Sequence, residues 1–165
     1  MEVIDDFLPI EQFRQIKDFM ISPTETSRLN SFPWFLMEHD PAAQPLMFVH
    51  LFYAEAKINS TAYEVLSNLI DGLREKDSLE TMIRIKANLY IRNDNLIEHS
   101  PHTDYPYSHK GAILYLDNSD GYTVIDSEKV GSKENRVVFF DPSIPHSSTN
   151  CTDSKYRSTI NFNYL

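Results

Sequence analysis

The spacing of the hydrophobic residues changes near residue 81, from helical spacing to strict alternation. Two segments before this point repeat apolar residues every three or four positions, as helices with one buried face do. The segments after it alternate apolar and polar residues, as half-buried strands do. Helices followed by closely spaced strands favour an α+β fold with a β-sandwich or barrel in the C-terminal half.

The N-terminal half predicts two helices. Pro9 opens the first one, at a position that tolerates proline because the first amide groups of a helix have no partner within it. The second begins near Thr61, which has capping-box spacing to Glu64. The two apolar stripes are Ile10, Phe13, Ile16, Phe19 and Met20 in the first helix, and Tyr63, Leu66, Leu69, Ile70 and Leu73 in the second.

The rest of the N-terminal half is less regular. A short strand is expected over residues 3–7. Residues 21–50 contain four prolines and are expected to be irregular, because proline interrupts both helices and strands. Within them, the aromatic stretch "FPWFL" at residues 32–36 is expected to pack in the core.

The C-terminal half predicts strands over residues 82–92, 111–117, 122–126, 136–141 and 156–164. Turn-forming sequences separate them at 118–121, 130–135 and 141–145. The first and last strands each carry an entirely polar face, which in a surface strand would contact solvent. The two polar faces consist of Arg84, Lys86, Asn88, Tyr90 and Arg92 in the first strand, and Arg157, Thr159, Asn161 and Asn163 in the last.

Composition and charge narrow the class of protein. A chain of 165 residues suits a single domain over 1–165. Its formal net charge of −9 disfavours nucleic acid as a partner, because binding phosphates requires a basic surface. No apolar run approaches the length of a membrane span, and the start of the chain does not resemble a signal peptide. One cysteine, Cys151, excludes an internal disulfide. We therefore expect a cytoplasmic protein without a membrane segment.

His102-Thr103-Asp104 is the strongest candidate for a metal site. Residues two apart at the end of a strand project to the same side, so His102 and Asp104 could bind one ion. Two histidines and one carboxylate form the facial triad of non-haem iron sites. His146 is the best third ligand, because it follows a buried strand and the proline turn "DPSIP".

The other four histidines fit other roles better. His39 lies in an acidic, irregular stretch and is expected at the surface. His50 lies in an apolar run, where a hydrogen-bonded core histidine is the simpler explanation. His99 is expected in a loop, and His109 in a turn or near the substrate.

Two polar strand faces, a His-x-Asp pair and a distal histidine together suggest a polar interior between two sheets. The order of His-x-Asp, a histidine about forty residues later and Arg157 eleven residues after that resembles the 2-oxoglutarate- and iron(II)-dependent oxygenases. Within them the chain most resembles the prolyl 4-hydroxylase-like branch. The resemblance covers residues 81–165 and, more loosely, the N-terminal strand and helix.

The resemblance implies a double-stranded β-helix, or cupin-like jelly roll, over residues 81–165, backed by helical and strand elements over 1–80. It implies Fe(II) ligation by His102, Asp104 and His146. Arg157 then pairs with the distal carboxylate of 2-oxoglutarate, whose planar shape suits a guanidinium. The remaining cosubstrate-binding positions that it implies are Tyr115, Tyr90 and Asn161.

The implied reaction is hydroxylation of an unactivated C–H bond, with 2-oxoglutarate and O2 consumed and succinate and CO2 released. The intact acid of the His-x-Asp pair favours hydroxylation, because related halogenases replace it with a small residue. The chain departs from the pattern in having one glycine in "NSDGYT", where many relatives have two. Lys155 lies on the same strand face as Arg157, so strand parity alone does not choose between them.

Two other interpretations stay open. The protein could be a cupin-like metal-binding protein, either an isomerase or a binding module, that does not use 2-oxoglutarate. It could also be an inactive jelly roll that contacts other proteins. The expected substrate is a small molecule or a peptide side chain, which the aromatic loop "YPYSHKG" at 105–111 could clamp.

Overall fold

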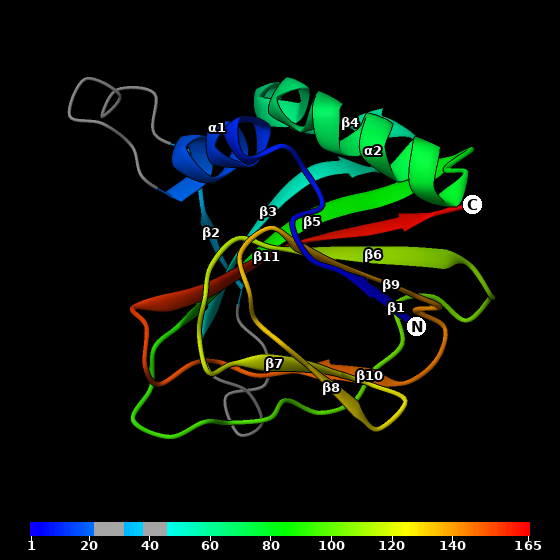
Figure 1. Ribbon diagram of the computed structural model, residues 1–165. Helices are drawn as coiled ribbons and strands as arrows, with labels where there is room; N and C mark the ends of the chain where they lie inside the picture. Colours follow the sequence, from blue (N-terminus) through cyan, green and yellow to red (C-terminus); the bar gives the residue numbers. More distant parts are fainter. Residues whose placement is uncertain (22–31, 38–45) are drawn as a thin grey trace.

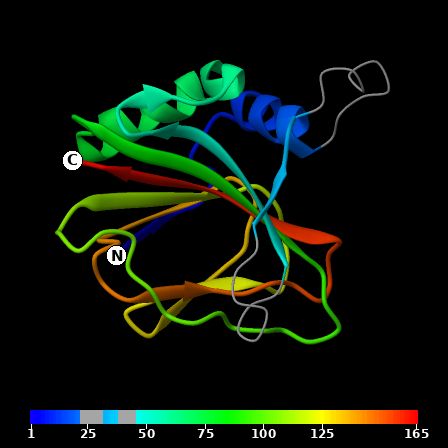
Figure 2. The same ribbon diagram turned by 180° about the vertical axis from the view of Figure 1, so that it is seen from behind.

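The computed structural model describes residues 1–21, 32–37 and 46–165. They form two facing antiparallel sheets, with the helices packed on the outer face of the larger one (Figures 1 and 2). The large sheet runs β1 (Glu2–Ile4), β9 (Arg136–Phe140), β6 (Lys110–Tyr115), β11 (Tyr156–Tyr164), β5 (Met82–Ile91), β3 (Met47–Ala54) and β2 (Phe35–Met37), with β4 (Lys57–Ile58) paired to β3. The small sheet runs β10 (His146–Ser148), β7 (Tyr122–Ile125) and β8 (Glu128–Gly131).

The main hydrophobic core lies between the helices and the large sheet. It is built by helix α1 (Ile10–Ile21), the short 3-10 helix η2 (Thr61–Leu66) and helix α2 (Ser67–Asp77). The apolar faces of β5 and β11 supply Ile85, Ala87, Ile160 and Phe162 to it. Since side chains alternate along a strand, the polar faces of the same strands point the other way, toward the small sheet.

A smaller apolar cluster closes one end of the space between the sheets. Ile113, Tyr115 and Val138 of the large sheet pack there against Ile125 and Val130 of the small sheet. The rest of that space is polar. The fold is therefore the jelly roll expected from the sequence. Its hydrophobic core lies under the helices, and the space between the two sheets is largely polar.

Several local predictions were wrong or incomplete. Ser60, not Thr61, caps the second helical segment, since its hydroxyl accepts from the amide of Ala62. That segment starts as a 3-10 helix before α2. The first strand is shorter than expected, and Ile10 and Phe19 of the α1 stripe are 46% and 45% exposed.

The other differences between the expected and the observed elements concern short strands and the aromatic stretch at residues 32–36. Strand β8 overlaps a region expected to be a turn, and the three-residue β10 begins at His146 itself. In "FPWFL", Phe32 is buried and Trp34 packs on the core, but Phe35 and Leu36 are exposed on the edge strand β2. Short edge strands carry little periodicity, so the sequence marks them weakly. Among the described residues, no helix is long and apolar enough to cross a bilayer.

Asn135 joins the N-terminal segment to the jelly roll. Its side chain accepts from the amide of Leu8 at 3.0 Å and donates to the carbonyl of Leu8 at 2.8 Å. The residue is buried and has a φ of 59°, a left-handed conformation that asparagine tolerates better than most residues.

Asn135→Ala is expected to lower the free energy of unfolding by about 2–4 kcal/mol, because it loses two buried hydrogen bonds and places alanine in the left-handed region. Denaturant titration measures the change. Asn95→Ala, at an exposed position, should shift stability by less than about 0.5 kcal/mol. Equal effects of the two substitutions would contradict this role for Asn135.

Cys151 is expected to be unreactive in the folded protein. It is 0% exposed, and burial raises the pKa of its thiol to about 11, so almost no thiolate exists at neutral pH. An aromatic disulfide reagent such as DTNB should therefore label one thiol in denaturant and none in native buffer. Rapid labelling of the native protein would show that the segment around Cys151 opens readily.

Candidate metal centre and its pocket

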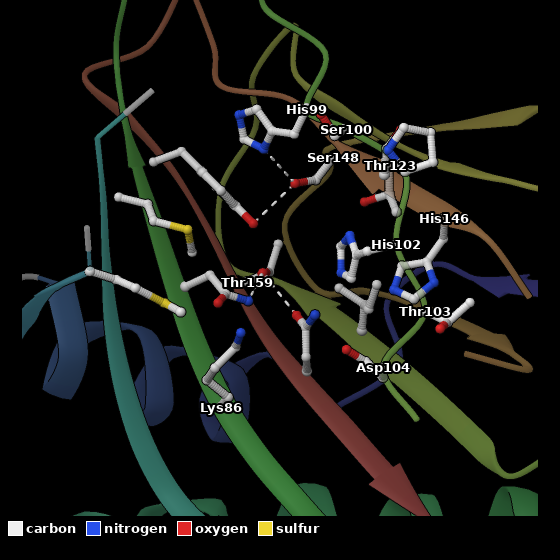
Figure 3. Close-up of a pocket in the computed structure, with 18 of the residues that line it drawn as sticks. Lys86, His99, Ser100, His102, Thr103, Asp104, Thr123, His146, Ser148 and Thr159 are labelled. Carbon is white, nitrogen blue, oxygen red and sulfur yellow. Dashed lines mark hydrogen bonds between the residues drawn. The ribbon is translucent and has the colours of Figure 1, made fainter. Parts of the chain in front are cut away.

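The side chains of His102 and Asp104 meet that of His146, which lies about forty residues later in the sequence, at one end of the polar interior. One ligand atom each from His102, Asp104 and His146 lie within 4.8 Å of one another. The two histidines form an antiparallel bridge, in which each amide donates to the other's carbonyl at 2.9 Å. This backbone pairing brings their rings to a centroid separation of 4.5 Å, and Figure 3 shows both rings beside Asp104.

Asp104 is held from both sides by polar residues of the large sheet. Arg84 of β5 forms an ion pair with one carboxylate oxygen at 2.6 Å, and Asn163 of β11 donates to the other at 2.9 Å. Arg84 also donates to Asn163 at 3.1 Å. Burial alone would raise the pKa of Asp104, but Arg84 and Asn163 outweigh it and lower the pKa. The carboxylate is therefore oriented and ionised.

Both histidines are suited to bind a cation through a ring nitrogen. Burial lowers the pKa of His102, and the neighbouring His146 lowers it further. Nδ1 of His146 lies 3.0 Å from the carbonyl oxygen of Ile144. A ring N–H that donates to a carbonyl leaves the other nitrogen free to ligate, which is the usual orientation of metal-binding histidines. Two such histidines and a carboxylate fit the donor set of non-haem Fe(II).

The triad opens into a cavity of about 410 Å³ between the sheets. The polar faces of β5 and β11 form its main wall, as the sequence predicted. Met37 of β2 and Met47 of β3 add an apolar edge. The residues contributed by β5 and β11 are Arg84, Lys86, Asn88, Tyr90, Arg157, Thr159 and Asn161.

Arg157 is 0% exposed and lies on the wall of this cavity. Its Nη1 donates to the carbonyl of Thr149 at 3.1 Å and its Nη2 to the hydroxyl of Thr123 at 2.8 Å. Its Nε is buried without a hydrogen-bond partner. Because the hydrogen-bond partners of this guanidinium among the described residues are neutral, an anion in the cavity would compensate its charge.

Gly121 makes room for this arginine. A Cβ at this position would lie 2.4 Å from Cδ of Arg157 and 2.5 Å from the carbonyl oxygen of Asn150. The single glycine of "NSDG" therefore permits the close approach of the guanidinium. The exposed Lys155 does not line the cavity, so the structure separates the two cations that strand parity left equivalent.

The two tyrosines lie on either side of Arg157. Each ring centre is 5.5 Å from the guanidinium carbon. Tyr90 lines the cavity and accepts from the hydroxyl of Ser148 at 3.0 Å. Tyr115 lies deeper and donates to Thr123 at 2.9 Å, so it reaches the cavity wall through that threonine. Burial raises the pKa of both tyrosines, which keeps them protonated.

Asn161 lines the cavity, and its side-chain amide oxygen accepts from the hydroxyl of Thr159 at 3.0 Å. The other histidines lie outside the triad. His50 is a buried core residue bound to the carbonyl of Pro33 and the hydroxyl of Ser60, each at 2.7 Å. His99 borders the cavity beside Ser148, while His109 lies against Asn163. His39 lies outside the described residues.

Sequence reasoning missed four residues that support the site. Arg84 and Asn163 lie on the two polar strand faces, so alternation marked their direction but not their contact with Asp104. Thr123 and Ser148 face each other in the small sheet, and nothing in their spacing points to Arg157. In the loop 105–111, Tyr105 packs against Tyr107 and over Arg84, and its role as a substrate clamp stays a prediction.

No family model and no curated protein matches the sequence. Solved structures match the fold. A prolyl hydroxylase from Trichoplax adhaerens, in complex with a hypoxia-inducible-factor peptide fragment, aligns at a TM-score of 0.71 and 10% identity, covering 99% of this chain and 82% of that one. The α-ketoglutarate-dependent non-haem epimerase SnoN from nogalamycin biosynthesis aligns at 0.68 and 12%, covering 99% and 76%.

A prolyl 4-hydroxylase from Pseudomonas putida aligns at a TM-score of 0.63 and 12% identity, covering 99% of this chain and 91% of that one. At these identities the similarity establishes the fold. The chain folds as the jelly roll of the 2-oxoglutarate- and Fe(II)-dependent oxygenases and the prolyl 4-hydroxylases, which is the family resemblance seen in its sequence.

Proposed function

We propose that the protein is an Fe(II)- and 2-oxoglutarate-dependent oxygenase that hydroxylates an unactivated C–H bond of a small molecule or a peptide side chain. One observation carries this proposal. A two-histidine, one-carboxylate cluster and a buried arginine that forms no ion pair with the described residues line the same 410 Å³ cavity. The first suits a metal ion and the second suits a carboxylate, so the cavity could hold Fe(II) and 2-oxoglutarate together.

His102, Asp104 and His146 would hold the metal. Arg84 and Asn163 orient the carboxylate before the metal arrives, so little ordering is needed on binding. Because the three protein ligands come from one side, other positions on the metal stay open to the cosubstrate and oxygen. Bound Fe(II), 2-oxoglutarate and O2 supply the oxidising power for C–H hydroxylation, with succinate and CO2 as the by-products.

Arg157 would hold the distal carboxylate of 2-oxoglutarate. Thr123 and the carbonyl of Thr149 fix its guanidinium, and Tyr90 and Tyr115 exclude water from both sides. The burial of an arginine costs free energy unless an anion or hydrogen bonds compensate. This cost supports a cosubstrate role over a cupin-like protein that binds only metal, because such a protein has no need for the buried cation.

The metal assignment is tested by substitution. Asp104→Ala and His146→Ala are expected to remove bound iron, since two remaining ligands hold Fe(II) weakly. His99→Ala is the matched control, because His99 borders the same cavity without joining the triad. It should keep about one iron per chain, as should His109→Ala. Metal analysis after anaerobic loading gives the stoichiometry, and unchanged iron in the first two variants would refute the triad.

The cosubstrate assignment is tested at Arg157. Arg157→Ala should weaken 2-oxoglutarate binding by at least about tenfold, because one hydrogen bond between charged groups contributes roughly 1.5–3 kcal/mol and tenfold corresponds to about 1.4 kcal/mol. Iron binding should persist. Calorimetric titration of the iron-loaded protein under anaerobic conditions measures the affinity.

Lys155→Ala is the control for Arg157, because it removes a nearby exposed cation and should leave the affinity nearly unchanged. Arg157→Gln retains more side-chain volume and distinguishes loss of binding from loss of folding. A large loss in the lysine variant with a small loss in the arginine variants would move the anchor to Lys155.

A further inference from the structure

The charge of the cavity is opposite to that of the whole protein. The chain has 24 acidic residues and 15 lysines and arginines. The cavity wall, however, includes three cations, Arg84, Lys86 and Arg157, and one carboxylate, Asp104. Bound Fe(II) and 2-oxoglutarate have equal and opposite formal charges, so they leave this local excess of positive charge unchanged.

Two of the three cations already have partners. Arg84 is paired with Asp104, and the proposed function assigns Arg157 to 2-oxoglutarate. Lys86 makes no hydrogen bond or ion pair with any residue in the described ranges. Figure 3 shows its side chain reaching from β5 into the cavity that also contains His102, Asp104 and His146.

The surroundings of Lys86 make its charged ammonium unfavourable without an anion beside it. Burial, and to a smaller extent the charge of Arg84, lower the pKa of Lys86 to about 8, while Asp104 acts in the opposite direction. Desolvation of an ammonium is unfavourable unless an anion compensates for it. An anionic ligand beside Lys86 would raise this pKa again. The ligand and Lys86 would then form a partly desolvated ion pair.

The neighbouring side chains indicate which anion fits. Asn161 lies opposite Lys86 in the β5–β11 register, and Asn88 is the next inward residue of β5. The side-chain nitrogen of Asn88 donates to the hydroxyl of Thr159 at 3.4 Å, and its side-chain oxygen is buried without a hydrogen-bond partner among the described residues. One lysine beside amide groups suits a carboxylate. A lysine can also bind a phosphate as a point charge, so phosphate esters form a separate arm of the test.

Resting on the proposed function, we infer that the substrate is a small carboxylic acid whose carboxylate binds Lys86 beside the metal. Met37 and Met47 add an apolar edge to the cavity, where Met47 lies opposite Tyr90 in the β3–β5 register, so a carbon chain that extends from Lys86 toward this edge is apolar. A small carboxylic acid with an apolar chain fits these features, because its carboxylate suits Lys86 and its chain suits the two methionines.

The test compares matched pools of compounds on protein loaded with Zn(II), as an inert metal, and 2-oxoglutarate. The first pool contains apolar amino acids and simple aliphatic and aromatic carboxylic acids. The second contains the same compounds as primary amides, and a third contains phosphate monoesters of similar size. Ligand-observed NMR detects binding, and succinate release by the Fe(II)-loaded protein detects turnover.

Members of the acid pool should bind and stimulate succinate release, while the amides and phosphate esters should not. Lys86→Met keeps the length of the side chain and removes its charge, so it should weaken binding of those acids by about tenfold or more. Lys155→Met removes an exposed lysine outside the cavity and should bind them as the unmodified protein does.

Four results would overturn the inference while leaving the proposed function intact: an equal response to acids and amides, a response to phosphate esters alone, no response to any pool, or full binding by Lys86→Met. A loss of 2-oxoglutarate affinity in Lys86→Met as large as that in Arg157→Ala would place the lysine at the cosubstrate and also overturn it. Failure of the unmodified protein to bind 2-oxoglutarate would instead refute the proposed function.

Discussion

The site depends on the register between β5 and β11. Arg84 lies opposite Asn163 and Tyr90 lies opposite Arg157, in adjacent strands with antiparallel pairing. A slip of one residue would turn the polar face of one strand toward the helices and its apolar face into the cavity. The hydrophobic core under the helices therefore fixes the register, and through it the positions of the groups that hold Asp104 and surround Arg157.

Burial of charge in the interior is the other constraint. The charges of Arg84 and Asp104 neutralise each other in an ion pair, and Asn163 forms hydrogen bonds with both side chains. The partners of Arg157 among the described residues are neutral, namely the oxygens of Thr123 and Thr149 and the rings of Tyr90 and Tyr115. Lys86 makes no hydrogen bond or ion pair with the described residues. Charges that are incompletely compensated in a cavity are typical of binding sites rather than of stabilising networks, and here both point toward anionic ligands.

Much of this arrangement could be predicted from the sequence. Alternation in residues 82–92 and 156–164 predicted both the strands and which of their faces is polar. The sequence also predicted that His102, Asp104 and His146 could meet. The expected position of His102 and Asp104 at the end of a strand was wrong, because they lie in the segment between β5 and β6, which pairs with β10 at His146. The choice of Arg157 over Lys155 came from the family resemblance, and the burial of one and exposure of the other agree with it.

Other features could not be predicted because they depend on contacts between distant segments. The ion pair between Arg84 and Asp104 spans the cavity, and the short strand β10 exists through pairing with β7 rather than through its own pattern. The backbone pairing of His102 with His146 likewise has no local signal. Strand alternation gives the direction of a side chain, but the register of the whole sheet decides what it meets.

The central claim is that one cavity holds Fe(II) and 2-oxoglutarate together. Anaerobic addition of 2-oxoglutarate to the Fe(II)-loaded protein tests it most directly, followed by visible absorption spectroscopy. A weak charge-transfer band should appear only when both are present, because it requires the keto acid to chelate the iron. Iron-loaded protein that binds 2-oxoglutarate without such a band, or does not bind it, would contradict the account.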